Sequence, residues 1–341
     1  MRKISRRSFL TCAAAVSAAG LLAACGGSSS SVAAGASSAA GGASAPAAKV
    51  FNIGISQLAP HVALDAATQG FKDALTNEFG DRVKFNEQNA AGEIPTCTTI
   101  ANSLVSAECD LILANATPAL QALATAADEI PVLGTSVTEY GVALNIPDFD
   151  GLVGTNVSGT SDLAPLTEQA AMVKEWFPKA KTVGLLYCSA EANSQYQVDV
   201  VKAELEALGY TCTLYAFTDT NDLASVTEKA ANNSDVIYVP TDNTVANNTG
   251  IIDNICRPAG VPIIAGEEGI CSGCGVATLS ISYYDLGVTT GEMAIKILKG
   301  EAKVEEMPIE YAPQFTKKYN ETICKDLKLT VPAGYEAIQT K

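Results

Sequence analysis

Residues 110–120 read D-L-I-L-A-N-A-T-P-A-L, and residues 235–245 read D-V-I-Y-V-P-T-D-N-T-V. Each is a short apolar run that ends in small polar residues and leads into a helical stretch. A second apolar run follows each helix, I-P-V-L-G-T-S at 130–136 and V-P-I-I-A-G-E-E at 261–268. Apolar runs that alternate with helices predict parallel βαβ units. The chain therefore carries two copies of one α/β design.

The rest of the sequence extends each copy into a lobe. Further strands are predicted at 51–58, 83–88, 151–157, 182–187, 211–217 and 276–281. The turn-rich segment S-G-T-S-D at 158–162 predicts a crossing that acts as a hinge. We expect an α/β protein with two Rossmann-like lobes, each with a parallel sheet, joined by this hinge.

The predicted lobe boundaries follow from the same pattern. The N-lobe spans about 50–158 and the C-lobe about 160–280. By analogy with two-lobed binding folds, the helix at about 284–298 returns to the N-lobe. Part of 310–341 is assigned to the C-lobe.

The N-terminus predicts export and lipid anchoring. Residues 1–24 have a basic start followed by an apolar stretch, which is typical of a signal peptide. L-A-A-C at 22–25 has lipobox form, so Cys25 is the expected lipidated first residue of the mature protein. S-R-R-S-F-L at 5–10 also resembles a twin-arginine signal, and the export route stays open. Residues 26–48 contain only Gly, Ser, Ala, Val and Pro, which predicts a flexible tether from 25 to 48.

The charge of the chain excludes two classes of partner. The formal net charge is −15, and removing the four basic residues of the first 24 leaves −19. Nucleic acids require a basic face, so we expect no nucleic-acid partner. An acidic chain is also repelled from anionic lipid surfaces.

Polar residues stand at the ends of the predicted strands, where open parallel sheets bind ligands. In the N-lobe these are Thr117, Thr135 and Ser136. In the C-lobe they are Asp242, Asn243 and Glu267-Glu268, of which one glutamate faces the cleft. The loop that contains Ser189 and Glu191 adds a polar wall, and Tyr283 either lines a pocket or packs between the lobes.

Two of these positions predict the chemistry of the ligand. Asp242 can accept a hydrogen bond from a ligand ammonium, although it could equally cap the next helix. Thr117-Pro118 begins a helix in the other lobe, and the free N–H groups of a helix start favour an anion. An ammonium and a carboxylate together are what an α-amino acid presents.

No catalytic or cofactor motif is present. The only histidine is His61, so a Ser-His-Asp or Cys-His scheme would have to use it. C-S-G-C at 271–274 lies in a segment that reads as a Gly-rich loop. Free thiols, a disulfide or a functional pair are open for it, and no second pair completes a zinc site. We expect no enzyme, no metal and no cofactor.

Several segments resemble the ABC-transporter substrate-binding lipoproteins associated with tryptophan, tyrosine and phenylalanine uptake. These segments are I-G-I-S-Q-L at 53–58, A-L-D-A-A-T-Q-G-F-K-D-A-L at 63–75, A-T-P-A-L-Q-A-L at 116–123, V-S-G-T-S-D at 157–162, Y-C-S-A-E-A-N-S at 187–194, V-P-T-D-N-T-V-A at 239–246, G-V-P-I-I-A-G-E-E-G at 260–269 and Y-Y-D-L-G-V-T-T-G-E-M-A at 283–294. The resemblance covers about 50–335. The loop at 188–192 departs from it, with Cys188, Ala190 and Ala192 where relatives tend to have Asn, Ser and Pro.

The resemblance implies a type I periplasmic-binding fold. The ligand, an aromatic or other apolar amino acid, would lie between the lobes and be delivered to an ABC permease. A monomeric, lipid-anchored protein outside the cytoplasm is expected. The ligand-binding positions carried over are Gln57, Thr117, Thr135, Ser136, Ser189, Glu191, Asp242, Asn243, Glu267 and Tyr283.

Two other classes of function compete with import. A secreted two-lobed racemase would need a thiol base on each lobe, and Cys188 has no evident partner at an N-lobe strand end. A receptor domain would instead present its ligand state to a signalling partner. Neighbouring genes for a permease and an ATPase would favour import, whereas a sensor kinase would favour signalling.

Overall fold

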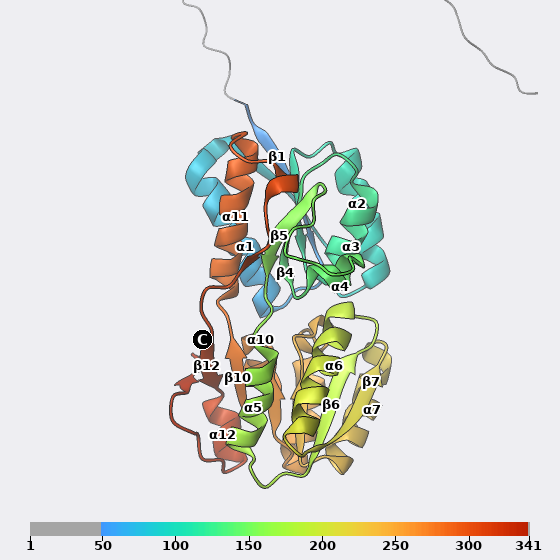
Figure 1. Ribbon diagram of the computed structural model, residues 1–341, viewed down its shortest axis with the longest axis vertical. Helices are drawn as coiled ribbons and strands as arrows, with labels where there is room; N and C mark the ends of the chain where they lie inside the picture. Colours follow the sequence, from blue (N-terminus) through green and yellow to red (C-terminus); the bar gives the residue numbers. More distant parts are fainter. Residues whose placement is uncertain (1–48, 340–341) are drawn as a thin grey trace, which may run out of the picture. The chain divides into compact units, whose positions relative to one another are not determined.

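Two α/β lobes are formed by residues 49–339, which are the residues that the computed structural model describes (Figure 1). The first lobe has a six-stranded sheet in the order β11-β5-β4-β3-β1-β2, and the second a seven-stranded sheet in the order β13-β12-β10-β9-β8-β6-β7. Paired strands are parallel except β10 and β12. The predicted pair of lobes with mainly parallel sheets is confirmed.

The strands are short, as expected for parallel sheets. The first sheet contains β1 (Phe51–Gln57), β2 (Val83–Asn89), β3 (Leu111–Asn115), β4 (Val132–Val137), β5 (Val157–Ser161) and β11 (Glu310–Tyr311). The second contains β6 (Thr182–Cys188), β7 (Thr211–Phe217), β8 (Val236–Val239), β9 (Ile263–Ala265), β10 (Ala277–Ser280), β12 (Thr316–Tyr319) and β13 (Glu336–Ala337).

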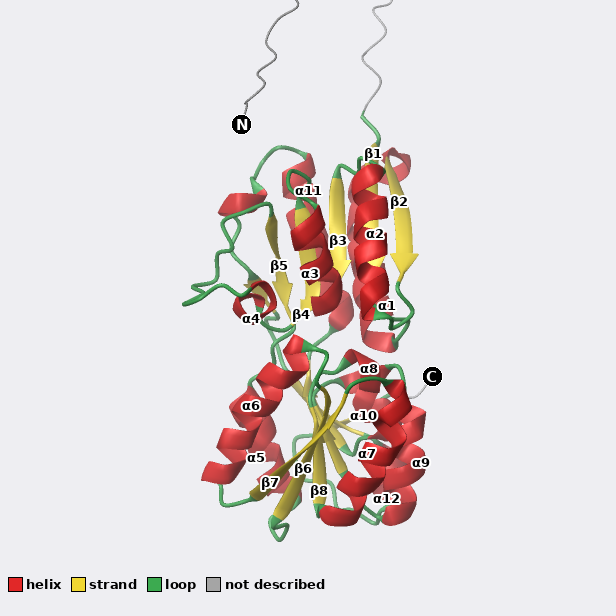
Figure 2. Ribbon diagram, turned by 90° about the vertical axis from the view of Figure 1, so that its right-hand side faces the viewer, coloured by secondary structure: helices red, strands yellow, loops and turns green. Residues whose placement is uncertain are grey.

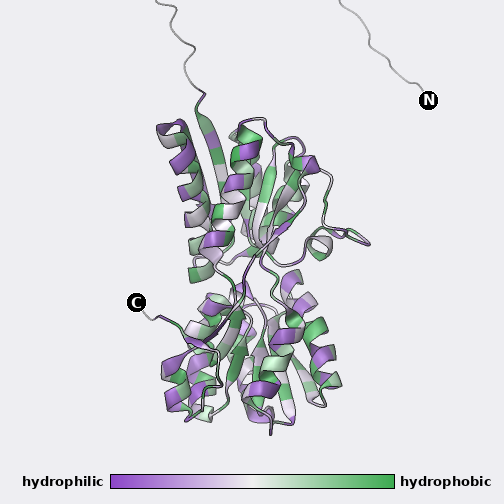
Figure 3. Ribbon diagram, turned by 60° about the vertical axis from the view of Figure 1, so that its left-hand side comes forward, coloured by the Kyte–Doolittle hydropathy of each residue, from purple (hydrophilic) through white to green (hydrophobic). Residues whose placement is uncertain are grey.

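Helices cover both faces of each sheet (Figure 2). The first lobe has α1 (Val62–Phe79), α2 (Ile94–Ser106), α3 (Thr117–Ala126), α4 (Tyr140–Leu144), α11 (Tyr283–Leu298) and the 3-10 turns η1 (Gly80–Arg82) and η2 (Val304–Glu306). The second has α5 (Leu166–Trp176), α6 (Ala192–Ala207), α7 (Thr220–Asn233), α8 (Asn243–Ala246), α9 (Thr249–Ala259), α10 (Glu268–Cys274) and α12 (Glu321–Asp326). Figure 3 shows hydrophobic and hydrophilic residues alternating along these helices, so that one side of each can face a sheet.

Strand β3 explains why the repeated runs are apolar throughout. Leu111 and Leu113 pack with α1 and α11 on one face of the sheet. Ile112 and Ala114 pack with α2 and α3 on the other face. Successive side chains of a strand point to opposite faces, so a strand with helices on both sides needs apolar residues at every position.

The chain crosses between the lobes three times. It leaves β5 for α5, returns from β10 through α11, and leaves β11 for β12. The three crossings are neighbours, because β11 pairs with β5 in the first lobe and β12 pairs with β10 in the second. The two lobes are therefore joined by three adjacent segments.

Helix α11 packs closely against α1. A side chain at Gly70 would collide with the backbone of Tyr284, and one at Gly287 with the backbone of Ala67. The glycines let the two backbones approach each other, which fixes α11 to the first lobe. Tyr283, at the first position of α11, is thereby held at the edge of the cleft.

Two local predictions are wrong. The predicted strand at 151–157 is a loop up to Asn156, and β5 occupies most of the segment read as a turn. That segment is small and polar because Gly159 packs against the backbone of Gly134 and the hydroxyl of Tyr140, where a side chain has no room. The C-S-G-C segment is helix α10 rather than a loop, and all eight cysteines from Cys97 to Cys324 are free thiols.

The predicted signal peptide, Cys25 and the tether lie outside the described residues. Among residues 49–339, no helix combines the length and the apolar character that a membrane span requires.

Candidate ligand site between the lobes

A narrow cavity lies between the lobes, beyond the strand ends of the sheets. Its lining comes from the start of α1, from two interlobe crossings and from the strand ends of the second lobe. The residues are His61, Ala63, Leu64, Asp162, Thr241, Asp242, Asn243, Ala246, Glu267 and Tyr283. Four predicted site residues, Asp242, Asn243, Glu267 and Tyr283, are thus brought together.

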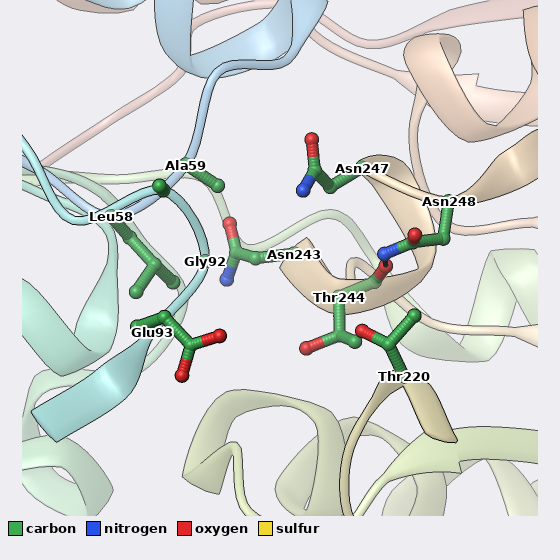
Figure 4. A pocket seen from close by; sticks show the side chains of 10 residues that line it. Leu58, Ala59, Gly92, Glu93, Thr220, Asn243, Thr244, Asn247 and Asn248 are labelled. Atoms are coloured by element: carbon green, nitrogen blue, oxygen red, sulfur yellow. Dashed lines mark hydrogen bonds between the residues drawn. The ribbon is translucent and has the colours of Figure 1, made fainter. Parts of the chain in front are cut away.

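A second pocket shares Asn243 with this cavity (Figure 4). Residues of the loops after β1 and β2 form one wall, and residues of α7 and α8 and the turn after α8 form the other. They are Leu58, Ala59, Ala91, Gly92, Glu93, Thr220, Asn243, Thr244, Asn247 and Asn248. Both lobes therefore contribute residues to two pockets that meet at Asn243.

Asp242 is buried and caps α8. Its Oδ1 accepts from the backbone N–H of Val245 at 2.9 Å, and its Oδ2 accepts from that of Cys188 at 2.7 Å. Burial raises the pKa of Asp242 to about 7, and the nearby carboxylate of Glu191 acts in the same direction. The helix-cap role that the sequence left open is present, and the side chain also lines the cavity.

Glu267 has the same arrangement at the start of α10. Its carboxylate accepts from the N–H groups of Gly269 and Ile270, and burial raises its pKa to about 7. Its neighbour Glu268 forms a salt bridge with Lys318 at 2.5 Å. Of the two glutamates, Glu267 is the one that lines the cavity.

Glu191 is fully buried and organises α8 rather than the cavity wall. It accepts from the Asn243 side chain at 2.6 Å and from both the backbone N–H and the hydroxyl of Thr244 at 2.8 Å. Ser189 in the same loop is exposed, and its hydroxyl donates to the carbonyl of Phe217 at 3.1 Å. These two predicted residues lie outside the linings of both pockets.

His61 and Asn243 link the lobes directly. His61 precedes α1, and its Nε2 lies 3.2 Å from Oδ1 of Asn243. Burial lowers the pKa of His61, while the bond to Asn243 and the charge of Glu191 partly oppose that shift. Its Nδ1 is buried and has no hydrogen-bond partner among the described residues. A neutral imidazole thus lines the cavity.

The predicted N-lobe residues divide into two groups. Gln57 is engaged internally, accepting from Thr68 at 2.6 Å and donating to Asp65 at 2.7 Å, and Thr135 accepts from Thr160 at 3.3 Å. Thr117 and Ser136 form the second group. Their hydroxyls are buried, yet within residues 49–339 neither has a hydrogen-bond partner.

Thr117 and Ser136, like Gln57 and Thr135, are not among the residues that line either pocket, but the backbone beside them has an unusual conformation. Ala116 has φ 90° and Ser136 has φ 54°, values that residues with a side chain adopt infrequently. Such conformations persist where surrounding structure enforces them and are common at binding sites. The start of α3 also has N–H groups that intrahelical bonding cannot satisfy. Together these groups can donate to an anion.

The model of the family described as ABC transporter substrate binding protein matches residues 52–338. The chain belongs to this family. Such proteins bind a small-molecule ligand outside the cytoplasm and pass it to an ABC permease. The predicted family and importer role are confirmed, and the two-lobed architecture is the type I periplasmic-binding fold.

Relatives of this substrate-binding protein have recorded ligands. A tyrosine-binding protein of Clostridioides difficile (strain R20291) is 36% identical over 287 residues, which cover 82% of this chain and 81% of the relative. An ABC domain from Streptococcus pneumonia, solved in complex with L-Trp, is 32% identical with a TM-score of 0.80. It is covered in full, and 85% of this chain is covered.

A third relative was solved without ligand. This substrate-binding protein of Clostridium difficile, in its ligand-free, open structure, is 37% identical with a TM-score of 0.65. The match covers 86% of this chain and all of the other. The present structure is therefore more similar to the Trp complex than to the open structure, although the sequence identities run the other way.

Sequence reasoning missed Asp162, which follows β5 and lines the cavity. It is 4% exposed, and its Oδ2 accepts from the hydroxyl of Tyr283 at 3.0 Å. The sequence pattern predicts a turn for this segment. The available signal was an acidic residue directly after the last strand of a lobe, where the chain enters the next lobe.

Proposed function

We propose that this substrate-binding protein binds an aromatic or other apolar L-amino acid in the interlobe cavity and delivers it to its permease. The observation that carries the proposal is the group of buried carboxyl side chains, Asp162, Asp242 and Glu267, around a cavity whose described lining has no lysine or arginine. Uncommitted hydroxyl donors stand on the first lobe, and buried carboxylates stand on the second lobe and the crossing. The recorded tyrosine and tryptophan ligands of two relatives support the same class.

The ligand carboxylate would lie at the first lobe. Thr117, Ser136 and the N-terminal turn of the ten-residue helix α3 offer hydroxyl and backbone donors there. Helix N-termini favour anions because their N–H groups and the helix dipole point at the site. The ammonium would lie across the cavity, where carboxylates need a cation to offset their burial.

The predicted ligand-binding residues and lobe boundaries belong to this proposal. The ligand-binding positions are Gln57, Thr117, Thr135, Ser136, Ser189, Glu191, Asp242, Asn243, Glu267 and Tyr283. Of these, Gln57, Ser189 and Glu191 act by holding neighbouring segments in place and do not touch the ligand. The N-lobe is 50–158 with the helix at 284–298, and the C-lobe is 160–280 with part of 310–341. We further propose a monomer without enzymatic activity.

Calorimetric titration tests the ligand class. The purified protein is titrated with L-tryptophan, L-tyrosine, L-phenylalanine and L-leucine, and with D-glucose as a ligand that carries neither charge. Saturable binding of at least one aromatic amino acid, and none of glucose, is the expected result. Binding of glucose in preference to every amino acid would refute the proposal.

Lipid anchoring at Cys25 is a separate part of the proposal. It is supported by the L-A-A-C segment at 22–25 and the tether that follows. Cys25→Ala should move the protein from the membrane fraction to the soluble fraction, which immunoblotting of fractionated cells would measure. Cys12→Ala, within the signal segment, is the matched control and should leave the protein at the membrane. Equal membrane retention of both variants would exclude this anchor.

A further inference from the structure

The two carboxylates that the sequence placed at the second lobe are already engaged. Both oxygens of Asp242 accept from backbone N–H groups, and so do both oxygens of Glu267. These bonds hold the starts of α8 and α10. A ligand ammonium would have to share acceptors that are already part of the local fold.

Asp162 differs from both. Its Oδ2 accepts from Tyr283, but its Oδ1 is buried and has no hydrogen bond of normal geometry within the described part of the chain. The hydroxyls of Thr138 and Tyr283 and the backbone N–H of Asp162 itself lie close to the carboxylate and oppose the rise in its pKa that burial causes. Oδ1 nevertheless has no partner of normal hydrogen-bond geometry among the described residues, at a side chain that lines the cavity. Buried acceptors without partners are rare in folded proteins.

The surroundings of Asp162 contain no compensating cation. Among the described residues that line the cavity there is no lysine or arginine, and burial lowers the pKa of the one histidine, His61. Asp242 and Glu267 add further carboxyl groups, and the phenol of Tyr283 is neutral because burial raises its pKa well above the usual value. A buried carboxylate without a partner is costly, so the site favours a cationic group.

We propose that Asp162 accepts the ammonium group of the bound amino acid, with Tyr283 holding the carboxylate in place. The inference rests on the proposed function and names the residue that selects an amino acid over the corresponding acid without the amino group. Asp162 lies on the first crossing, and Tyr283 begins α11 directly after the second. The ammonium therefore binds at the hinge itself, where both lobes meet.

The test compares ligands with and without the amino group. L-tryptophan and indole-3-propionate share the indole and the carboxylate, and only the first has the ammonium. Titration calorimetry of the full mature protein is done with the wild type, Asp162→Asn and Asp242→Asn. Asp128→Asn on the exposed surface is the charge-matched control. L-tyrosine and 3-(4-hydroxyphenyl)propionate form the parallel pair.

Asp162→Asn should weaken binding of the amino acid at least tenfold and leave binding of the deaminated acid within about twofold. Charge-assisted hydrogen bonds are of sufficient strength for this loss. Asp128→Asn should bind both ligands as the wild type does. The deaminated acid could fail to bind both the wild type and Asp162→Asn. In that case, a loss of amino-acid binding in Asp162→Asn but not in Asp128→Asn supports the assignment.

Several outcomes would overturn the assignment. They are unchanged amino-acid binding in Asp162→Asn, an equal loss for both ligands, or a selective loss in Asp242→Asn alone. If Asp162→Asn does not fold by circular dichroism, Asp162→Ser, which also lacks the charge, takes its place. A wild type that binds the deaminated acid as tightly as the amino acid also overturns it. A wild type that binds no amino acid at all would refute the proposed function instead.

Discussion

At the rim of the first lobe, the hydroxyls of Thr117 and Ser136 are buried without partners in residues 49–339. At the rim of the second lobe, the carboxylates of Asp242 and Glu267 each accept two backbone N–H groups. The hydroxyl donors of the first rim are thus available to a ligand. The carboxylate acceptors of the second rim are instead bonded to the first turns of short helices. Asp242 and Glu267 are therefore also residues on which the local fold depends, whereas Thr117 and Ser136 are not.

The largest effect on stability is expected at Glu191, which accepts several hydrogen bonds at the second rim. Glu191→Ala removes the acceptor for the N–H and hydroxyl of Thr244 and for the Asn243 side chain. Each buried group left unsatisfied costs roughly 1–3 kcal/mol, so the free energy of unfolding should fall by at least about 3 kcal/mol. Urea denaturation measures this loss. Glu228→Ala on the exposed face of α7 should change stability by less than about 0.5 kcal/mol. Equal stability of the two variants would show that the second rim does not depend on Glu191.

A pH titration sharpens the comparison at Glu267. Its pKa is about 7 in the folded state and near 4.5 when unfolded. A raised pKa gives stability that is complete below the unfolded value and is lost as the pH rises through the folded value. Between pH 5.5 and pH 8, Glu267 should cost the ligand-free protein about 2 kcal/mol of stability.

Thermal unfolding in the absence of ligand measures this pH dependence. The melting temperature should fall by several degrees on going from pH 5.5 to pH 8. Glu267→Gln cannot titrate and should show a shallower decline over the same range, whatever its absolute stability. The same slope in both proteins would mean that the folded carboxyl titrates normally.

The smallest effect on stability, and a clear one on binding, is expected at the first rim. Thr117→Val keeps the shape of the side chain and removes the unpartnered hydroxyl. We expect about a tenfold loss of amino-acid affinity, close to 1.4 kcal/mol, with an unchanged melting temperature in the absence of ligand. Thr98→Val on the exposed face of α2 is the control and should alter neither quantity. A drop in melting temperature without a loss of affinity would make Thr117 a structural residue like those of the second rim.

The sequence predicted the fold where local pattern and tertiary structure agree. The apolar runs at 111–115 and 236–239 are strands because both of their faces are covered by helices. At 157–161 the sequence pattern predicted a turn, but the segment is strand β5. Its residues are small because Gly159 packs against Tyr140, where a side chain has no room. Composition alone does not separate these two reasons for small residues.

At the site, the sequence predicted positions but not hydrogen-bond partners. Asp242, Glu267 and Thr117 stand at strand ends, as the repeat indicated. That Glu191 would serve the start of α8 could not be predicted, because its partners lie 52 and 53 positions further along the chain. The sequence likewise does not show that Tyr283, which is 121 positions away, donates to Oδ2 of Asp162. It also does not show that Oδ1 is left without a partner among the described residues.

The three adjacent crossings also limit how the molecule can move and how it can be cut. Segments that run side by side resist torsion between the lobes and leave rotation about one axis as the main degree of freedom. Opening and closing would then be one rotation of the lobes about this axis. A membrane partner that contacts either lobe would experience that rotation. A protease that nicks one crossing would leave two covalent connections, so the cut protein should still migrate as one particle.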